Sequence, residues 1–343
     1  MSPDDRVDLV TGGTGFIGSH IVRALLDRGR RVRCLVRPNS VRTNLDGLSI
    51  EIVEGDLTDA ASLRELVHGG KTLYHCAADY RLWARDPREI FRSNVEGTRN
   101  ILELADEAGV ERIVYTSSVA AIGLMADGSP ADEQTRMREK DLIGPYKRSK
   151  YDAEGVAREL AYRGAPVVIV NPSTPVGERD LKPTPTGRII LDFLNRKMPA
   201  YVDTGMNLID VRDVAAGHLL AAERGRSGER YILGNRNVSL KELFDILADI
   251  TGIPAPRLKV PHWVPMAYAA VGTAVAKLTR RAPRVPLDSV RMSRHTMYYD
   301  ASKAVRELGL PQTPIEEALA RAVAWFRENG YVKDWKSKEA PSF

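Results

Sequence analysis

A glycine-rich stretch near the N-terminus, VTGGTGFIGSH (10–20), limits the possible folds more than any other part of the chain. Gly12, Gly15 and Gly18 lie three residues apart, between an apolar run and an amphipathic one. Glycine permits a tight turn and close approach of the backbone to a pyrophosphate, and the next helix N-terminus supplies unpaired N–H groups. Although a glycine turn can serve packing alone, its position between strand and helix predicts a dinucleotide site.

The first half of the sequence alternates short apolar runs with longer amphipathic stretches. Two of these stretches, SHIVRALLDRG and TRNILELADEAG, end in Gly29 and Gly109, where left-handed C-caps are expected. Such alternation predicts an α/β fold with a doubly wound parallel sheet, a Rossmann fold, covered by helices on both faces. The predicted strands are 7–12, 31–36, 50–55, 72–77, 112–117, 166–171 and 228–234.

From residue 171 onward the composition changes, because the sequence NPSTPVGERDLKPTPTGR is rich in proline and glycine. We expect a smaller mixed substrate lobe here, with segments that return to the main sheet. Amphipathic helices are predicted at SLKELFDILADITG and PIEEALARAVAWFREN. The predicted division is a nucleotide-binding domain at 1–173 with returns near 210–233 and 298–306, a substrate lobe at 174–209 and 234–297, and a C-terminal helix and tail at 307–343.

Charge and cysteine usage exclude several classes of protein. The net charge of +5 is spread without a dense basic block, which argues against nucleic acid as a partner. Cys34 and Cys76 fall in predicted strands and, like the six scattered histidines, lack metal-ligand spacing, so no metal is predicted. MSPDDRVDLV does not resemble an export signal and no apolar run could span a bilayer, so we expect a cytoplasmic protein.

The end of the second predicted strand indicates which dinucleotide binds. NAD-specific folds place a carboxylate there for the ribose hydroxyls. This chain has CLVRPNSVR instead, with Arg37 at the position of the acid and Arg42 shortly after it. A guanidinium can form a bidentate pair with the 2′-phosphate of NADP. The alternative interpretation is that Arg37 is an ordinary solvated surface arginine. We therefore predict NADP(H), with NAD(H) as the alternative.

Three side chains suggest proton-transfer chemistry at the same edge of the sheet. Ser118 follows the fifth strand, and Tyr146 and Lys150 stand four residues apart at the start of a predicted helix, so they share one face. Ser118 would hydrogen-bond a substrate carbonyl or hydroxyl, and Tyr146 would exchange the proton. Lys150 would hold the nicotinamide ribose and lower the pKa of the phenol through its charge. A serine here can also be only a helix cap.

The order of glycine loop, serine and Tyr-x-x-x-Lys resembles the extended short-chain dehydrogenase/reductase superfamily, in its epimerase/dehydratase branch. Further similar segments are GDLTD (55–59), HCAAD (75–79), SNVEGT (93–98), NPSTPVG (171–177), DVRDVAAGH (210–218) and DASKAVRELG (300–309). The resemblance implies that Asp56 contacts adenine and that Asn94 supports the active site; Asp213 and Lys303 are later landmarks. It implies cofactor contacts at Gly12, Thr14, Gly15, Phe16, Ile17, Gly18, Arg37, Asp56, Leu57, Ala77, Ala78, Tyr146, Lys150, Pro172 and Ser173.

A narrower resemblance links AADYRLWARDP (77–87) and MPAYVDTGMNLIDVRDVAAGHLLA (198–221) to hopanoid-associated sugar epimerases, which also resemble dihydroflavonol 4-reductases. Nucleotide-sugar enzymes of the superfamily usually carry an Arg-Asp pair where this chain has Met206 and Asn207. A substrate diphosphate then lacks its charge partner, unless Arg179, Arg188 or Arg212 replaces it. We therefore favour a reductase or dehydrogenase, with hopanoid lipid metabolism as one setting, over a nucleotide-sugar epimerase or dehydratase. A non-catalytic dinucleotide sensor ranks last, because the tyrosine and lysine are both present.

Substrate and partner contacts are less specified by the sequence. Tyr80 and Trp83 in DYRLWARD would line the substrate site together with Ser118 and Thr174, although aromatic packing under a loop is an equal alternative. The apolar stretch WVPMAYAAVGTAVAKLTRRAPR (263–284) ends in a basic cluster. Contact with a membrane surface is one interpretation, and ordinary helix packing is favoured. The family resemblance implies a homodimer through helices near 88–108 and 147–163.

Overall fold

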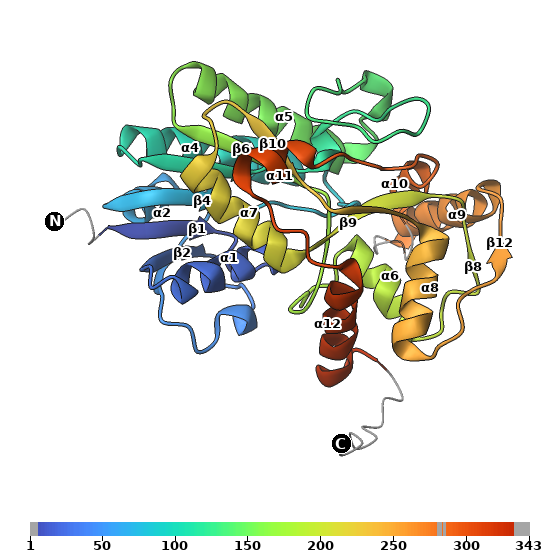
Figure 1. Ribbon diagram of the computed structural model, residues 1–343. Coiled ribbons are helices and arrows are strands. Elements are labelled where there is room, and N and C mark those ends of the chain that lie inside the picture. Colours follow the sequence, from blue (N-terminus) through green and yellow to red (C-terminus); the bar gives the residue numbers. More distant parts are fainter. Residues whose placement is uncertain (1–5, 280–282, 284–285, 333–343) are drawn as a thin grey trace, which may run out of the picture.

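The computed structural model describes residues 6–279, 283 and 286–332. Its centre is a sheet of seven parallel strands in the order β10-β6-β5-β4-β1-β2-β3 (Figure 1). The strands are β1 (Val7–Thr11), β2 (Val32–Val36), β3 (Glu51–Glu54), β4 (Gly70–His75), β5 (Arg112–Thr116), β6 (Val167–Pro172) and β10 (Arg230–Leu233). The predicted doubly wound α/β fold is confirmed, with its strands at the expected places.

Helices cover both faces of this sheet and create two separate hydrophobic cores. Successive strand residues point to opposite faces, so Val10 belongs to one core and Leu9 to the other. The first face is covered by α1 (Phe16–Asp27), α7 (Val211–Arg224) and α11 (Ser302–Leu308), and the second by α2 (Ala60–Val67), α4 (Gly97–Glu107) and α5 (Gly144–Tyr162). Gly29 and Gly109 have φ of +69° and +71°, which confirms the predicted left-handed ends of α1 and α4.

A smaller lobe adjoins the carboxyl ends of the main strands (Figure 1). Its three-stranded sheet has the order β11-β9-β7, and its core joins Phe193, Phe244 and Phe326 from three helices. The elements are β7 (Thr174–Val176), α6 (Pro185–Leu194), β8 (Ala200–Tyr201), β9 (Gly205–Asp210), β11 (Arg236–Ser239), α8 (Leu240–Thr251), β12 (Leu258–Lys259), α9 (Trp263–Thr279), α10 (Leu287–Met292) and α12 (Ile315–Glu328). Because α12 packs into this core, it is part of the lobe, whereas the predicted tail lies outside the described residues from 333 onward.

Short helical turns complete the chain between these elements. They are η1 (Thr43–Leu45), α3 (Arg88–Phe91), the π-helical turn η2 (Arg92–Glu96), η3 (Val119–Ala121) and η4 (Glu139–Asp141). Cys34 is buried in β2 as expected, whereas Cys76 follows the end of β4 and is only partly buried. In the part of the chain that is described, no helix is both long and apolar enough to cross a bilayer.

Candidate active site

The glycine loop joins β1 to α1 and packs too tightly for side chains. Gly12 has φ of +74°, and a Cβ atom there would lie 2.7 Å from the backbone nitrogen of Ala77. A Cβ on Gly18 would lie 2.2 Å from the carbonyl oxygen of Gly12. Gly15 caps α1 without a side chain and is exposed, so the N–H groups of the first turn of α1 are accessible. This cradle has the form that a pyrophosphate requires.

Residues around this cradle are held by local contacts. The carboxylate of Asp56 accepts hydrogen bonds from the backbone and hydroxyl of Thr58 at 3.0 and 2.8 Å. Leu57 is buried and packs against Gly97. The carbonyl of Thr14 accepts a hydrogen bond from Asn44 at 3.3 Å, which ties the loop to η1. Phe16, Ile17, Ala77 and Ala78 are all partly buried beside the same loop ends.

The two arginines after β2 differ in their surroundings. Arg42 forms an ion pair with Glu54. Arg37 is exposed, and its guanidinium has no hydrogen bond or ion pair within the described chain. Of the two, Arg37 is therefore the one that is available to an added phosphate.

Ser118, Tyr146 and Lys150 lie at the carboxyl edge of β5. Ser118 caps η3, where its hydroxyl accepts a hydrogen bond from the backbone N–H of Ala120 at 3.1 Å. Tyr146 and Lys150 both lie on α5, as predicted. The side chain of Ser118 lies close enough to the phenol of Tyr146 to lower its pKa, so the two hydroxyls are neighbours. The same Ser118 hydroxyl therefore caps η3 and occupies the position expected for the catalytic serine.

Lys150 has different partners from those expected. Its Nζ donates hydrogen bonds to the carbonyl of Thr116 at 2.8 Å and to the hydroxyl of Tyr115 at 3.2 Å. Burial raises the pKa of Tyr146, and the influence that lowers it is the hydrogen bond with Ser118. The expectation that the charge of Lys150 lowers the pKa of this phenol stays a prediction. Lys150 is buried and turned toward β5 by its two hydrogen bonds.

A buried carboxylate that no sequence motif indicated lies behind this site. Glu154 accepts hydrogen bonds from Ser117 Oγ at 2.6 Å and Asn171 Nδ2 at 2.7 Å, and pairs with Arg230 at 2.9 Å. It stands four residues after Lys150, on the same face of α5. That spacing was the available signal, but Arg230 is distant in sequence. Glu154 links α5 to β5, β6 and β10 and opposes the effect of burial on Lys150.

A second buried chain of hydrogen bonds supports Lys150 indirectly, through Tyr115. Thr11 Oγ1 contacts His75 Nδ1 at 2.7 Å, and His75 Nε2 contacts Thr98 Oγ1 at 3.0 Å. The His75 ring stacks on Tyr115 with 5.7 Å between centroids, and burial lowers the pKa of His75 to about 3. The imidazole is therefore neutral at physiological pH. It connects the end of β1 with the tyrosine that holds Lys150.

Asn94 connects the loop after β4 with α5. It lies in the π-helical turn η2, a feature often found at functional sites. Its carboxamide accepts from the N–H of Asp79 at 2.6 Å and donates to the carbonyl of Asp79 and to Ser149 Oγ, each at 2.9 Å. Since Ser149 precedes Lys150, this agrees with the supporting role that the resemblance implied.

The predicted substrate contacts are spread over two loops and a strand of the small lobe. Tyr80 is exposed and its hydroxyl donates to the carbonyl of Lys182 at 3.2 Å, while Trp83 is partly buried. Pro172 ends β6, and Thr174 begins β7. Between them, the hydroxyl of Ser173 is buried without a hydrogen-bond partner in the described structure.

The arginines considered as diphosphate partners are placed as follows. Arg212 pairs with Glu178 at 2.8 Å. Arg179 has φ of +69° and lies near Arg23, on the side of α1, and Arg188 lies near Asp180. Asn207 is buried and donates to Asn237 Oδ1 at 2.9 Å, so its polar capacity is used inside the small sheet.

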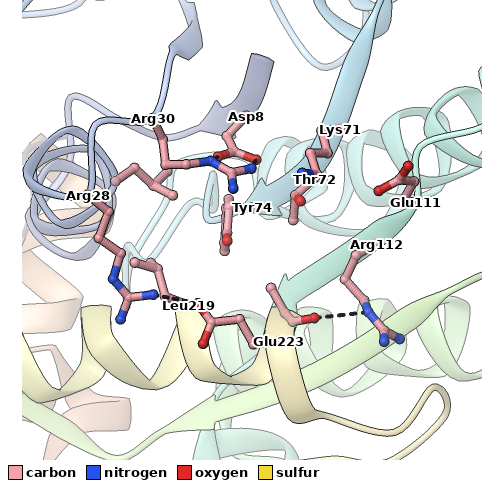
Figure 2. A pocket seen from close by; sticks show the side chains of 12 residues that line it. Asp8, Arg28, Arg30, Lys71, Thr72, Tyr74, Glu111, Arg112, Leu219 and Glu223 are labelled. Atoms are coloured by element: carbon pink, nitrogen blue, oxygen red, sulfur yellow. Dashed lines mark hydrogen bonds and ion pairs between the residues drawn. The ribbon is translucent and has the colours of Figure 1, made fainter. Parts of the chain in front are cut away.

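A separate pocket of about 360 Å³ opens at the amino ends of the main strands (Figure 2). Its charged side chains are largely paired with each other. Arg30 binds Asp8 through two hydrogen bonds of 2.9 and 3.2 Å, and Arg28 pairs with Glu223 at 2.5 Å. Ligands of open parallel sheets bind at the carboxyl ends of the strands, so this pocket lies outside the candidate active site.

The residues at the carboxyl edge fit a bound dinucleotide on three observations. The cradle has no space for a Cβ atom at Gly12 or Gly18, so the chain can fold this tightly only with glycine at these positions. The unpartnered hydroxyl of Ser173 lies in the segment expected to pass the nicotinamide carboxamide. The free guanidinium of Arg37 follows β2, where the adenosine ribose is expected.

Burial of Lys150 predicts a specific pH dependence of stability. Burial lowers the pKa of Lys150 from 10.5 to about 8, while the Glu154 carboxylate opposes the shift. Between these values the unfolded chain holds the proton and the folded protein has released it, so stability rises with pH. The free energy of unfolding of the wild type should therefore increase relative to Lys150→Met from pH 8 to 10.5. Urea unfolding without added cofactor measures this, and a constant difference would contradict it.

The chain is similar to several known proteins over most of its length. The sequence profile of the NAD dependent epimerase/dehydratase family matches residues 9–234. The chain is 56% identical to the "Putative dihydroflavonol 4-reductase" of Synechocystis, over 94% of this chain and 95% of that protein. It is 39% identical to the sterol demethylase protein B of Methylococcus capsulatus, over 94% and 99% of the two chains. The crystal structure of gox2253 superimposes with a TM-score of 0.86 at 48% identity, covering 96% of this chain and 100% of that one.

The glycine cradle, the parallel sheet and these similarities lead to one assignment. The matched region begins within β1, at residue 9, and includes every other strand of the main sheet up to the end of β10. The relatives extend the similarity over the small lobe as well. The chain belongs to the NAD dependent epimerase/dehydratase family and is an NAD(P)-dependent enzyme of the extended short-chain dehydrogenase/reductase type.

Proposed function

We propose that this enzyme is an NADP(H)-dependent oxidoreductase that interconverts a carbonyl compound and an alcohol. The observation that carries the proposal is the placement of Ser118, Tyr146 and Lys150 together at the edge of β5, next to the glycine cradle. NADP(H), when bound, supplies or accepts the hydride. The residues of the chain bind the substrate oxygen and move its proton.

Each of the three side chains has one task in this proposal. The hydroxyl of Ser118 is fixed by its cap bond and orients the substrate oxygen. Tyr146 gives a proton to this oxygen in reduction and takes it back in oxidation. Lys150 holds the nicotinamide ribose with its remaining donor capacity, because an ammonium has three donors and two are used in this structure.

Glu154 and Asn94 are positioning residues in this scheme. Glu154 holds Ser117, the neighbour of Ser118, and its charge favours the protonated form of Lys150. Asn94 fixes the start of α5 through Ser149. Neither side chain needs to touch the substrate to act, since both restrict the geometry of groups that do.

Arg37 supports the choice of NADP(H). Replacing it with glutamine should weaken NADPH binding by about 10–100-fold, because a charge-assisted hydrogen bond contributes about 1.5–3 kcal/mol. NADH binding should hardly change, since its ribose carries no phosphate. Fluorescence titration of both cofactors measures the ratio. Arg42→Gln is the matched control because Arg42 pairs with Glu54, and equal loss of both cofactors in Arg37→Gln would contradict the assignment.

The substrate class follows from the small lobe and from the relatives. With Met206 buried and Asn207 bonded inside the sheet, these positions offer no cation to a diphosphate. A relative named sterol demethylase protein B and others named sterol-4-alpha-carboxylate 3-dehydrogenase act, by name, on polycyclic lipids. We therefore infer an apolar, polycyclic or aromatic carbonyl or alcohol, with hopanoid lipid metabolism as one setting.

The test of this function uses NADPH labelled with deuterium at the transferable position. Incubation with a panel of sterol, hopanoid and flavonoid ketones should place deuterium on the alcohol carbon of at least one product, detected by mass spectrometry. Nucleotide-sugar epimerisation is the competing activity that the family description allows. Tightly retained NAD, together with epimerisation of a UDP- or GDP-sugar, would overturn the reductase proposal.

A further inference from the structure

We propose that α9 docks the protein on the surface of an anionic lipid bilayer. This helix lies at the outer end of the small lobe, away from the main sheet (Figure 1). One side of the helix packs on the lobe, in agreement with the packing interpretation of this stretch, whereas another side is apolar and exposed among the described residues. The inference stands on this uncovered face and on the charge of the surrounding sequence, and it is independent of the reaction proposed above.

The apolar face of α9 is exposed over the length of the helix. The exposed fractions are 71% for Trp263, 57% for Tyr268, 66% for Val271 and 53% for Val275. At about 100° per residue, Val264, Tyr268, Val271 and Val275 fall within one narrow sector of the helix. Ala269 and Ala276 are buried on a different side of the helix, where α9 packs on the lobe. The protein therefore presents an apolar helix face to its surroundings, in place of the polar face that a soluble surface helix normally shows.

The sequence around α9 is strongly basic. Between Asp249 and Asp288 the chain contains no acidic residue and six basic ones, which exceeds the net charge of +5 for the whole protein. They are Arg257, Lys259, Lys277, Arg280, Arg281 and Arg284. Lys259 pairs with Asp203. Arg280, Arg281 and Arg284 lie outside the described residues and contribute here through their charge alone.

An anionic bilayer fits this combination better than other partners. Trp and Tyr favour the membrane interface, and nearby Lys and Arg each add about 1 kcal/mol of attraction to anionic lipids. A twofold dimer through α9 would instead bring two copies of the same basic, acid-free segment together. Over its described residues, α9 is not long and apolar enough to cross a bilayer. It would lie in the plane of the membrane with its apolar face inserted.

Co-sedimentation with lipid vesicles tests the proposal. The full chain should bind vesicles of phosphatidylcholine mixed with phosphatidylglycerol, more weakly at high salt, and much less to phosphatidylcholine alone. Val271→Glu combined with Val275→Glu should reduce this binding at least about tenfold, because each carboxylate must enter the interface. Tyr162→Glu combined with Val305→Glu is the matched control, since it adds the same charge at exposed apolar positions on α5 and α11.

Two further measurements separate the possible outcomes. Emission from Trp263 should shift to shorter wavelength on anionic vesicles, and Trp263→Phe should remove that shift. NADPH binding should be equal in the wild type and the Val271/Val275 variant, which shows that the variant is folded. Absence of vesicle binding would overturn the proposal. So would binding that the Val271/Val275 variant retains, or a concentration-dependent dimer that this variant abolishes.

Discussion

Tyr146→Phe is expected to lower turnover by about 10²–10⁴-fold, the usual contribution of a positioned proton donor. The substitution removes only the phenolic oxygen, which neighbours Ser118 at the edge of β5. The dissociation constant for NADPH should stay nearly unchanged, because the glycine cradle and Arg37 are untouched. Steady-state oxidation of NADPH with any ketone that the enzyme accepts measures the first quantity, and fluorescence titration measures the second.

Tyr151→Phe provides the matched control for this experiment. Tyr151 lies on the same helix, but its side chain is 41% exposed. The Tyr151→Phe variant should therefore keep wild-type turnover. If Tyr146→Phe has a turnover close to that of the control, the proton-transfer role of Tyr146 is contradicted. A loss of turnover with an equal loss of NADPH affinity would instead assign Tyr146 to cofactor binding.

Gly12→Ala is expected to destabilise the protein by about 2–5 kcal/mol and to abolish NADPH binding. The left-handed backbone of residue 12 contributes about 1–2 kcal/mol to this loss for a residue with a Cβ atom. The remainder, about 1–3 kcal/mol, comes from overpacking, since that Cβ would lie 2.7 Å from the nitrogen of Ala77 and 2.8 Å from the carbonyl carbon of Cys76. Relief requires the end of β4 to move away from the loop.

Gly29→Ala separates the two contributions. Gly29 has φ of +69°, close to the +74° of Gly12, but a Cβ atom on Gly29 would have no neighbouring atom within 4 Å in the described chain. It should therefore lose only the backbone part, about 1–2 kcal/mol, and retain NADPH binding. Urea unfolding of the wild type and the two variants measures the change in stability, and titration with NADPH measures binding. Equal destabilisation by the two substitutions would show that the contact between the loop and Ala77 has little importance.

Much of the fold could be predicted because its signals are local. The alternation of apolar runs with amphipathic helices specifies the parallel sheet, and Gly29 and Gly109 mark the ends of their helices. The positions of Tyr146 and Lys150 on one helix face follow from a spacing of four residues. The glycine loop was recognisable for the same reason, because turn, helix start and backbone approach are all encoded within a few residues.

Helix α9 shows where a sequence pattern was insufficient. The composition of 263–284 suits either a packed helix or an interfacial one, because apolar residues serve both purposes. Which residues of α9 are covered depends on how the helix sits on the lobe. The buried side of Ala269 and Ala276 and the open side of Val271 and Val275 become distinct only in the folded chain.

The sequence by itself determined the fold class and the glycine-rich turn, and it indicated the serine, tyrosine and lysine of the candidate site. Only the tertiary structure decided the partners of these groups. Lys150 binds Tyr115 and Thr116, and Glu154 meets Arg230, 76 residues away in the chain. Periodicity and turn chemistry are properties of neighbouring residues. Burial, ion pairing and the resulting pKa values arise from contacts between distant segments, which exist only once the sheet has assembled.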